Sequence, residues 1–366
     1  MIPFLDLGAA TRELETEIHA AVARVVNSGW YVGGPEVTAF EEQWATYCSA
    51  RHAVGMANGL DALHLALRAV GVGPGDEVIV ASNSYIATQL AVTMAGATPV
   101  PVEPDPATHN LDPARIEAAI TAKTRVILPT HLYGQPADLD AIGAVAEAHG
   151  LVVIDDAAQV HGARYKGRRI GGGGASITCW SFYPSKNLGA LGDGGAITSN
   201  DPELAEKVRR LGNYGSSIRY VNQELGVNSR LDPIHAAVLG VKLKKLDEWN
   251  ARRARIAAHY SEALADRDGL TLPAVPDFAT PAWHLYVVRS RDRDRLAVRL
   301  AQAGVQTLIH YPIPPHRQQA YAAMGLSEGS LPIAEALAGE VLSLPIGPHL
   351  GMEQAERVAD AVRAAL

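Results

Sequence analysis

One stretch decides the fold: residues 151–159, LVVIDDAAQ. Four consecutive apolar, mostly β-branched residues predict a strand buried on both faces, as in a parallel sheet covered by helices. The run ends in Asp155 and Asp156, so we expect carboxylates at the carboxyl edge of the sheet, where open α/β folds bind ligands. Because side chains alternate along a strand, Asp155 is expected to point to the opposite face from Asp156.

The same pattern extends to both sides of this stretch. From about residue 54 to 200, short apolar runs alternate with helical segments, which predicts βαβ units and a mostly parallel sheet with helices on both faces. The other expected strands are 77–80, 98–102, 124–128, 176–182 and 196–199. Asp112-Pro113 and Asp201-Pro202 each place a capping carboxylate before a proline, which predicts two helix starts.

The chain is long enough for two domains. At 366 residues and 48% hydrophobic composition it exceeds the usual single-domain size. We predict a large domain over 1–245 and a small C-terminal α+β domain over 246–366, joined by a long helix from about 234 to 263. The small domain is expected to contain a strand at 283–288, a helix at 292–303, a strand at 307–310 and terminal helices.

Composition argues against several classes of function. A net charge of -7 does not suit a surface that binds nucleic acid. Neither a signal peptide nor an apolar run long enough to span a membrane is found, and Cys48 and Cys179 lack disulfide or metal-site spacing. The histidines show no HExxH motif, and no nicotinamide or ATP fingerprint occurs. We therefore expect a cytoplasmic protein without a metal.

The catalytic chemistry is indicated by residues 181–195, SFYPSKNLGALGDGG. Lys186 follows an apolar strand and precedes a glycine-rich segment, where burial would lower the pKa of its amine and let the neutral form attack a carbonyl. Asp156 could keep a pyridine nitrogen protonated, and a protonated ring stabilises a carbanion. Alone, Lys186 would be a surface charge and Asp156 a helix cap; together they indicate pyridoxal 5'-phosphate (PLP).

A phosphate would bind at residues 57–63, ANGLDAL, which predict a turn from strand to helix. The free backbone N–H groups of Gly59 and Leu60 could donate to it, and Ser181 is a second candidate ligand. Tyr85 could stack on the cofactor ring. The ordinary alternatives are a strand serine for Ser181 and a core aromatic for Tyr85.

Taken in order along the chain, these motifs resemble the DegT/DnrJ/StrS family of PLP-dependent nucleotide-sugar aminotransferases, which have the aspartate aminotransferase fold type I. The matching segments are 4–7, 59–63, 155–163, 181–187, 228–232 and 310–312. The resemblance implies that Lys186 binds the cofactor covalently, Asp156 pairs with the pyridine nitrogen and Gln159 contacts the ring hydroxyl. It also implies that Ser181 binds the phosphate and that Tyr85 stacks on the ring.

In this family an asparagine at the position of Asn228 reaches the phosphate of the neighbouring subunit. The resemblance therefore implies a homodimer with shared active sites.

One departure from the family concerns Leu60, where many relatives carry a serine or threonine that binds phosphate through its hydroxyl. Leu60 can contribute only its backbone N–H. Family members that act as dehydratases replace the lysine by histidine, so the retained Lys186 indicates transamination.

The resemblance also suggests a substrate. The segment around Tyr183, with tyrosine after Ser181-Phe182, resembles the family members that aminate 3-oxo sugars. Family members that act on 4-oxo sugars often have histidine at the position of Tyr183. We expect amination of a dTDP-linked 3-oxo-6-deoxyhexose, with or without a 4-hydroxyl, by L-glutamate, which becomes 2-oxoglutarate. Arg219, His310 and Tyr311 are the other expected substrate contacts.

The alternative functions are a 4-oxo sugar aminotransferase, a PLP-dependent dehydratase or lyase, and a non-catalytic PLP-binding regulatory protein. Sugar stereochemistry, the nucleotide and assembly beyond the dimer stay open.

Overall fold

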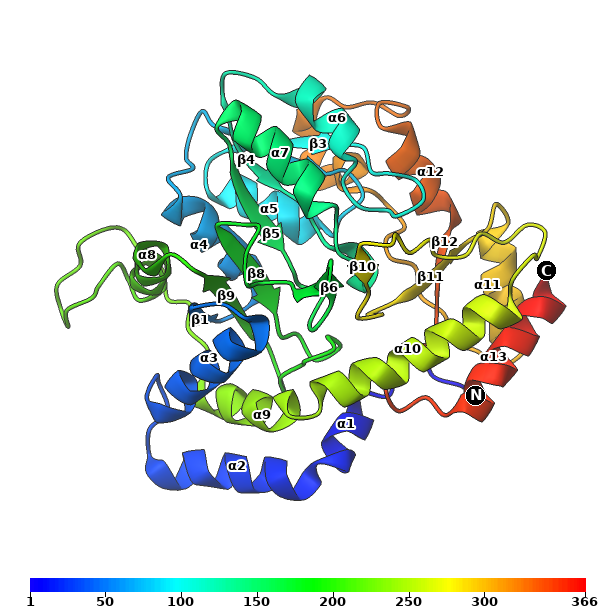
Figure 1. The fold of residues 1–366 in the computed structure, drawn as a ribbon, viewed down its shortest axis with the longest axis horizontal. Helices are drawn as coiled ribbons and strands as arrows, with labels where there is room; N and C mark the ends of the chain where they lie inside the picture. Colours follow the sequence, from blue (N-terminus) through cyan, green and yellow to red (C-terminus); the bar gives the residue numbers. More distant parts are fainter.

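The computed structural model describes all residues, 1–366, and is organised around a seven-stranded sheet (Figure 1). The strand order is β1-β9-β8-β5-β4-β2-β3, in which β9 is antiparallel to β1 and β8 while the other neighbours are parallel. The strands are β1 His52–Met56, β2 Glu77–Ala81, β3 Thr98–Val102, β4 Thr124–Leu128, β5 Val152–Asp156, β8 Ile177–Ser181 and β9 Gly195–Ser199. All six strands predicted in this region are confirmed.

Alternating apolar side chains bind helices to both faces of the sheet. Val78 and Val80 of β2 join the core beneath α4 (Gly59–Ala69), α5 (Ile86–Met94) and α8 (Pro202–Gly212). Ile79 between them faces α6 (Pro113–Ile116) and α7 (Leu139–His149). Each such buried aliphatic side chain stabilises the fold by about 1.5–3 kcal/mol. The predicted caps are confirmed: Asp112 accepts from Ala114 N at 3.0 Å and Asp201 from Glu203 N at 2.8 Å.

The helix predicted over 234–263 is two helices. The first is α9 (Pro233–Leu243) and the second is α10 (Leu246–Ala263), with a break at Lys244 and Lys245. The break lets the two helices pack on different neighbours, since α9 contacts α2 (Glu15–Ser28) and α3 (Pro35–Cys48) while α10 runs to α13 (Met352–Ala365) (Figure 1). The domain boundary near residue 245 stays a prediction.

The C-terminal region is built on a two-stranded sheet. β11 (Tyr286–Arg289) pairs antiparallel with β12 (Val341–Leu344). The helices here are α11 Arg293–Gln302, α12 Pro332–Glu340 and α13. The predicted strand at 307–310 is wrong: this segment forms only an isolated bridge between Leu308 and Ser343. The prolines that follow, at 312, 314 and 315, lack the N–H that a ladder needs, and β12 pairs with β11 instead.

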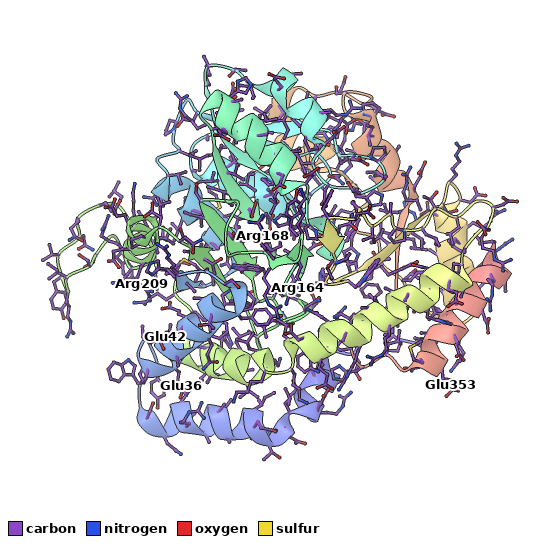
Figure 2. All side chains as sticks on the ribbon, viewed as in Figure 1. Glu36, Glu42, Arg164, Arg168, Arg209 and Glu353 are labelled. Atoms are coloured by element: carbon purple, nitrogen blue, oxygen red, sulfur yellow. The ribbon has the colours of Figure 1, made fainter.

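The remaining elements complete the shell. They are α1 Leu7–Glu13, the short strands β6 Arg164–Tyr165, β7 Arg168–Arg169 and β10 Ala279–Thr280, and the 3-10 turns at Glu117–Ala119, Leu132–Gly134, Pro315–Arg317 and Gln319–Met324. Charges of both signs are interspersed on the surface, such as Glu36 and Glu42 on α3 and Arg209 on α8 (Figure 2). No helix combines the length and the apolar character that crossing a membrane requires.

Candidate active site

Asp156 ends β5 and is buried, with 5% of its surface exposed. One carboxylate oxygen accepts hydrogen bonds from Thr88 Oγ1 at 2.8 Å and Thr130 Oγ1 at 3.3 Å, and the other accepts from Ala158 N at 3.2 Å. A carboxylate has about four acceptor positions, so Asp156 can accept one more proton donor. Its position on the sheet is therefore suited to hold a protonated group from outside the chain.

Asp155 points to the other face of the sheet, as predicted. One of its carboxylate oxygens lies 3.5 Å from His131 Nε2, and both side chains are buried. The Nδ1 atom of His131 accepts a hydrogen bond from Ala137 N at 3.0 Å, so Nε2 carries the proton of the neutral ring and faces Asp155. The two adjacent aspartates thus have separate environments, and only Asp156 shares a face with α5.

Lys186 lies on a tight loop that follows β8. Lys186 N donates to Tyr183 O at 2.8 Å, and Ala190 N donates to Phe182 O at 2.8 Å. The loop can close because Gly189 has no side chain: a Cβ there would lie 2.4 Å from Pro184 O. The Lys186 amine makes no hydrogen bond or ion pair within the chain. Burial lowers the pKa of Lys186 to about 8, although the charge of Asp156 acts in the opposite direction.

The turn before α4 presents free backbone donors. Asn58 caps the helix by accepting from Asp61 N at 2.8 Å, while the N–H groups of Gly59 and Leu60 have no partner in the chain. A Cβ at Gly59 would lie 2.7 Å from Cβ of Ser181, so the absence of a side chain brings the turn against Ser181. The turn and Ser181 together offer two N–H groups and one hydroxyl at a helix N-terminus, which fits a phosphate.

Aromatic and amide side chains form the next part of the site. The rings of Tyr85 and Tyr311 lie 5.1 Å apart between centroids. Gln159 Nε2 donates to Tyr311 Oη at 3.2 Å, while its Oε1 accepts from Tyr133 N at 2.6 Å. His310 Nδ1 is 2.8 Å from Ser343 Oγ, and burial lowers the pKa of His310 to about 4. Tyr85, Gln159 and Tyr311, which are far apart in sequence, are therefore neighbours.

Besides Tyr85, which is 54% exposed, three predicted site residues lie at exposed positions. Tyr183 is 54% exposed on the Lys186 loop. Arg219 stacks over the Tyr220 ring at 4.9 Å, in the segment after α8 that projects from the body of the molecule (Figure 1). Asn228 is also exposed, and its side chain makes no hydrogen bond within the chain. The substrate and partner-subunit roles of these three residues stay predictions.

Several polar residues at the site were missed by the sequence reasoning. Thr88 and Thr130 bind Asp156, and Asn187, Asn250 and His284 form a buried network next to Lys186. Only Thr88 carried a signal, since it lies three residues after Tyr85 at the start of a helix. Asn187 lies within the motif at 181–187 but was given no role, and Thr130, Asn250 and His284 come from distant segments outside any motif.

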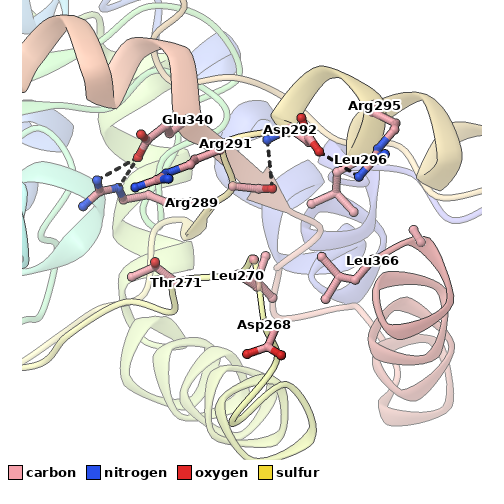
Figure 3. Close-up of a pocket in the computed structure, with 13 residues that line it drawn as sticks. Asp268, Leu270, Thr271, Arg289, Arg291, Asp292, Arg295, Leu296, Glu340 and Leu366 are labelled. Carbon is pink, nitrogen blue, oxygen red and sulfur yellow. Dashed lines mark hydrogen bonds and ion pairs between the residues drawn. The ribbon is translucent and has the colours of Figure 1, made fainter.

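A separate cleft lies in the C-terminal region (Figure 3). It has a volume of about 480 Å³ and lies between residues 268–271, the start of α11 and the C-terminus. Arg289 is paired there with Glu340 at 2.7 Å and Arg295 with Asp292 at 2.7 Å. None of the predicted site residues lines this cleft.

The seven-stranded sheet, with Asp156 at the end of β5 and Lys186 on the loop after the neighbouring β8, defines an aminotransferase of the aspartate aminotransferase fold type I. The chain belongs to the DegT/DnrJ/EryC1/StrS aminotransferase family, which residues 12–363 match. This confirms the family resemblance and the fold class expected from the sequence.

Similar proteins differ in what their names describe. The chain is 56% identical to the erythromycin biosynthesis sensory transduction protein EryC1 of Saccharopolyspora erythraea, covering 99% of both chains. It is also 56% identical to dTDP-3-amino-3,4,6-trideoxy-alpha-D-glucose transaminase of Streptomyces venezuelae, covering 99% of this chain and 95% of that protein. The crystal structure of S. venezuelae DesV with a ketimine intermediate superimposes with a TM-score of 0.98 at 55% identity, covering 99% and 98% of the two chains.

Proposed function

We propose that this protein is a PLP-dependent aminotransferase that converts the 3-keto group of a dTDP-linked 3-oxo-6-deoxyhexose to an amine, with L-glutamate as the amino donor. One observation carries the proposal: an unpartnered lysine with a lowered pKa lies on the same sheet edge as a buried aspartate that has a free acceptor position. Membership of an aminotransferase family supports the reaction type. The name of the S. venezuelae relative supports the substrate.

The residues present fit PLP at each of its functional groups. Asp156 would hold the ring nitrogen, and Gly59, Leu60 and Ser181 would bind the phosphate. Tyr85 and Gln159 would contact the ring face and the ring hydroxyl. When bound, PLP supplies an aldehyde that carries the amino group and a protonated ring that accepts electrons from the substrate carbon. Asp156 would keep the ring nitrogen protonated, because its carboxylate would attract that proton.

Lys186 would move the proton in both halves of the reaction. Glutamate loses a proton from its α-carbon and leaves as 2-oxoglutarate; the keto sugar later gains a proton at C3 and leaves as the amine. With a pKa of about 8, the Lys186 amine exists in both protonated and free forms near neutral pH, so it can serve as base and as acid. His310, next to Tyr311, has a pKa lowered by burial to about 4 and is therefore neutral near pH 7. It adds no second positive charge near the Lys186 amine.

The test is a comparison of two keto sugars. The purified protein is supplied with PLP, L-glutamate and either a dTDP-3-oxo-6-deoxyhexose or a dTDP-4-oxo-6-deoxyhexose. We expect the 3-oxo sugar to yield an amino sugar and 2-oxoglutarate in equal amounts. Faster turnover of the 4-oxo sugar would contradict the regiochemistry inferred from Tyr183.

The same assay separates the other candidate functions. A product that lacks nitrogen would indicate a dehydratase. The name of EryC1 favours a sensory role as the second candidate function. A sensor would bind PLP and sugar without releasing product, so turnover decides between the two.

We further propose that the protein is a cytoplasmic homodimer in which Asn228 contacts the partner's phosphate site. Exposed aromatic and aliphatic side chains support an interface, among them Trp30 and Tyr31 after α2 and Tyr214, Ile218 and Tyr220 near Asn228. Large apolar side chains left exposed on a chain are typical of a contact with another chain. The buried free thiols of Cys48 and Cys179 support a reducing compartment.

Mixed dimers test the shared site. Lys186→Ala and Asn228→Ala chains, carrying different tags and coexpressed, are purified as mixed and parent dimers. Each parent should be nearly inactive, whereas each mixed dimer should regain one intact site, so random pairing restores about a quarter of wild-type activity. The control pairs Lys186→Ala with Asp156→Ala, whose defects lie in the same chain's site, and should show no recovery. Recovery in neither mixture would contradict the role of Asn228.

A further inference from the structure

The residue that follows Lys186 is buried and fully hydrogen-bonded. Asn187 is 5% exposed. Its Nδ2 donates to Asn250 Oδ1 on α10 at 2.8 Å and to Ala282 O at 2.7 Å. Its Oδ1 lies 3.2 Å from His284 Nδ1. One side chain therefore joins the lysine loop to a helix and to the segment that leads into β11.

These contacts determine the protonation of His284. Because Asn187 Nδ2 faces a backbone carbonyl, the amide cannot be reversed, and its oxygen must face His284. Nδ1 of His284 therefore carries the proton and donates. Burial lowers the pKa of His284 well below its ordinary value, and the positive charges of Lys186 and Arg253 lower it further. The imidazole is neutral, and its Nε2 atom is unprotonated.

Further bonds hold the same loop and segment. Asn250 Nδ2 donates to His161 O at 2.7 Å, and the buried Lys242 donates to Gly189 O at 2.8 Å. Arg253 donates to His284 O at 3.2 Å. Trp283 has a φ of 49°, a left-handed conformation that a bulky residue adopts only where its surroundings impose it. The position of His284 is thus fixed by Asn187, by Arg253 and by the backbone conformation of Trp283.

We propose that Asn187 and His284 are positioning residues for Lys186. Their amide–imidazole pair holds the lysine loop against α10 and residues 282–284, and it surrounds the amine with neutral groups that exclude water. This inference rests on the proposed function, because it concerns the lysine assigned there to cofactor binding. It predicts that loosening the pair returns the amine to the solvated, protonated state of an ordinary lysine.

The experiment measures the Lys186 amine directly in the full chain freed of cofactor. Trace acetic anhydride labels free amines, and mass spectrometry reads the labelling of Lys186 as a function of pH. In the wild type we expect a midpoint of about 8. In Asn187→Ala the midpoint should rise by one unit or more, which lowers labelling near neutral pH about tenfold. Circular dichroism and thermal unfolding check that each variant is folded.

Two variants of His284 separate positioning from simple loss of packing. Asparagine can place an N–H where Nδ1 of histidine lies, so His284→Asn should keep the wild-type profile. Glutamine places its amide farther out, so His284→Gln should show the raised midpoint of Asn187→Ala. The matched control is Asn110→Ala: Asn110 is also buried and makes three bonds, to Gln135 O, Pro136 O and Leu132 N, away from the lysine loop. Its midpoint should equal that of the wild type.

Each outcome has a distinct meaning. A raised midpoint in Asn187→Ala and His284→Gln, with none in His284→Asn or Asn110→Ala, supports the positioning pair. An unchanged midpoint in Asn187→Ala, with a wild-type value near 8, overturns this inference and leaves the proposed function intact. A wild-type midpoint near that of ordinary lysine removes the observation on which the proposed function depends. Equal shifts in Asn110→Ala and Asn187→Ala also overturn the inference.

Discussion

Lys186→Ala is expected to abolish transamination, with kcat falling by about 10⁴-fold or more. Proton transfer by a positioned side chain alone contributes roughly 10² to 10⁴-fold, and this variant also loses the covalent attachment of the cofactor. The measurement combines turnover of glutamate and keto sugar with the visible spectrum of the PLP-loaded protein. The absorption band of the lysine-bound cofactor should be absent from the variant.

A second buried lysine provides the matched control. Burial also lowers the pKa of Lys242 to about 8, but its amine is bound to Gly189 O at 2.8 Å and is not free to react. Borohydride reduction of the loaded wild type, followed by mass spectrometry of peptides, should place the cofactor on Lys186 and leave Lys242 unmodified. A cofactor adduct on Lys242, or an unchanged absorption band in Lys186→Ala, would show that the assignment is wrong.

Asp156→Ala is expected to lower kcat by about 10³-fold, equivalent to about 4 kcal/mol of activation free energy. Without the carboxylate, the ring nitrogen loses the charge that holds its proton, and the ring accepts electrons less readily. Asp156→Asn should cause a similar loss, because the amide keeps the shape and the hydrogen bond from Thr88 but carries no charge. Rates of each half-reaction, followed separately with glutamate and with keto sugar, are the measurement.

The neighbouring aspartate tests whether the effect belongs to one face of the sheet. Asp155 is buried against His131 on the other face, so Asp155→Asn should reduce thermal stability while leaving kcat within a few-fold of wild type. Near-normal turnover in Asp156→Asn, or an equal loss in Asp155→Asn, would contradict the role given to Asp156.

Local sequence patterns predicted the strands and several site residues because each signal lies within a few consecutive residues. The apolar run before Asp156 predicted a buried strand, and alternation correctly placed Asp155 on the opposite face. The turn at 57–63 predicted free N–H groups at a helix start, and the structure shows those of Gly59 and Leu60 without partners. In contrast, the strand predicted at 307–310 is wrong: the segment makes only one bridge, from Leu308 to Ser343 of β12, and prolines follow it at 312, 314 and 315.

The amino-acid sequence by itself determined the alternating α/β architecture, the lysine loop and the aspartate at a strand end, since these follow from hydrophobic periodicity and from residue types along a short stretch. Only the tertiary structure decided that Thr88 and Thr130 bind Asp156, that Gln159 meets Tyr311, and that Asn187 and His284 pair beside Lys186. Those contacts join residues separated by 26 to 152 positions. The physical reason is that a hydrogen bond between distant segments depends on how helices and strands pack, which no short pattern encodes.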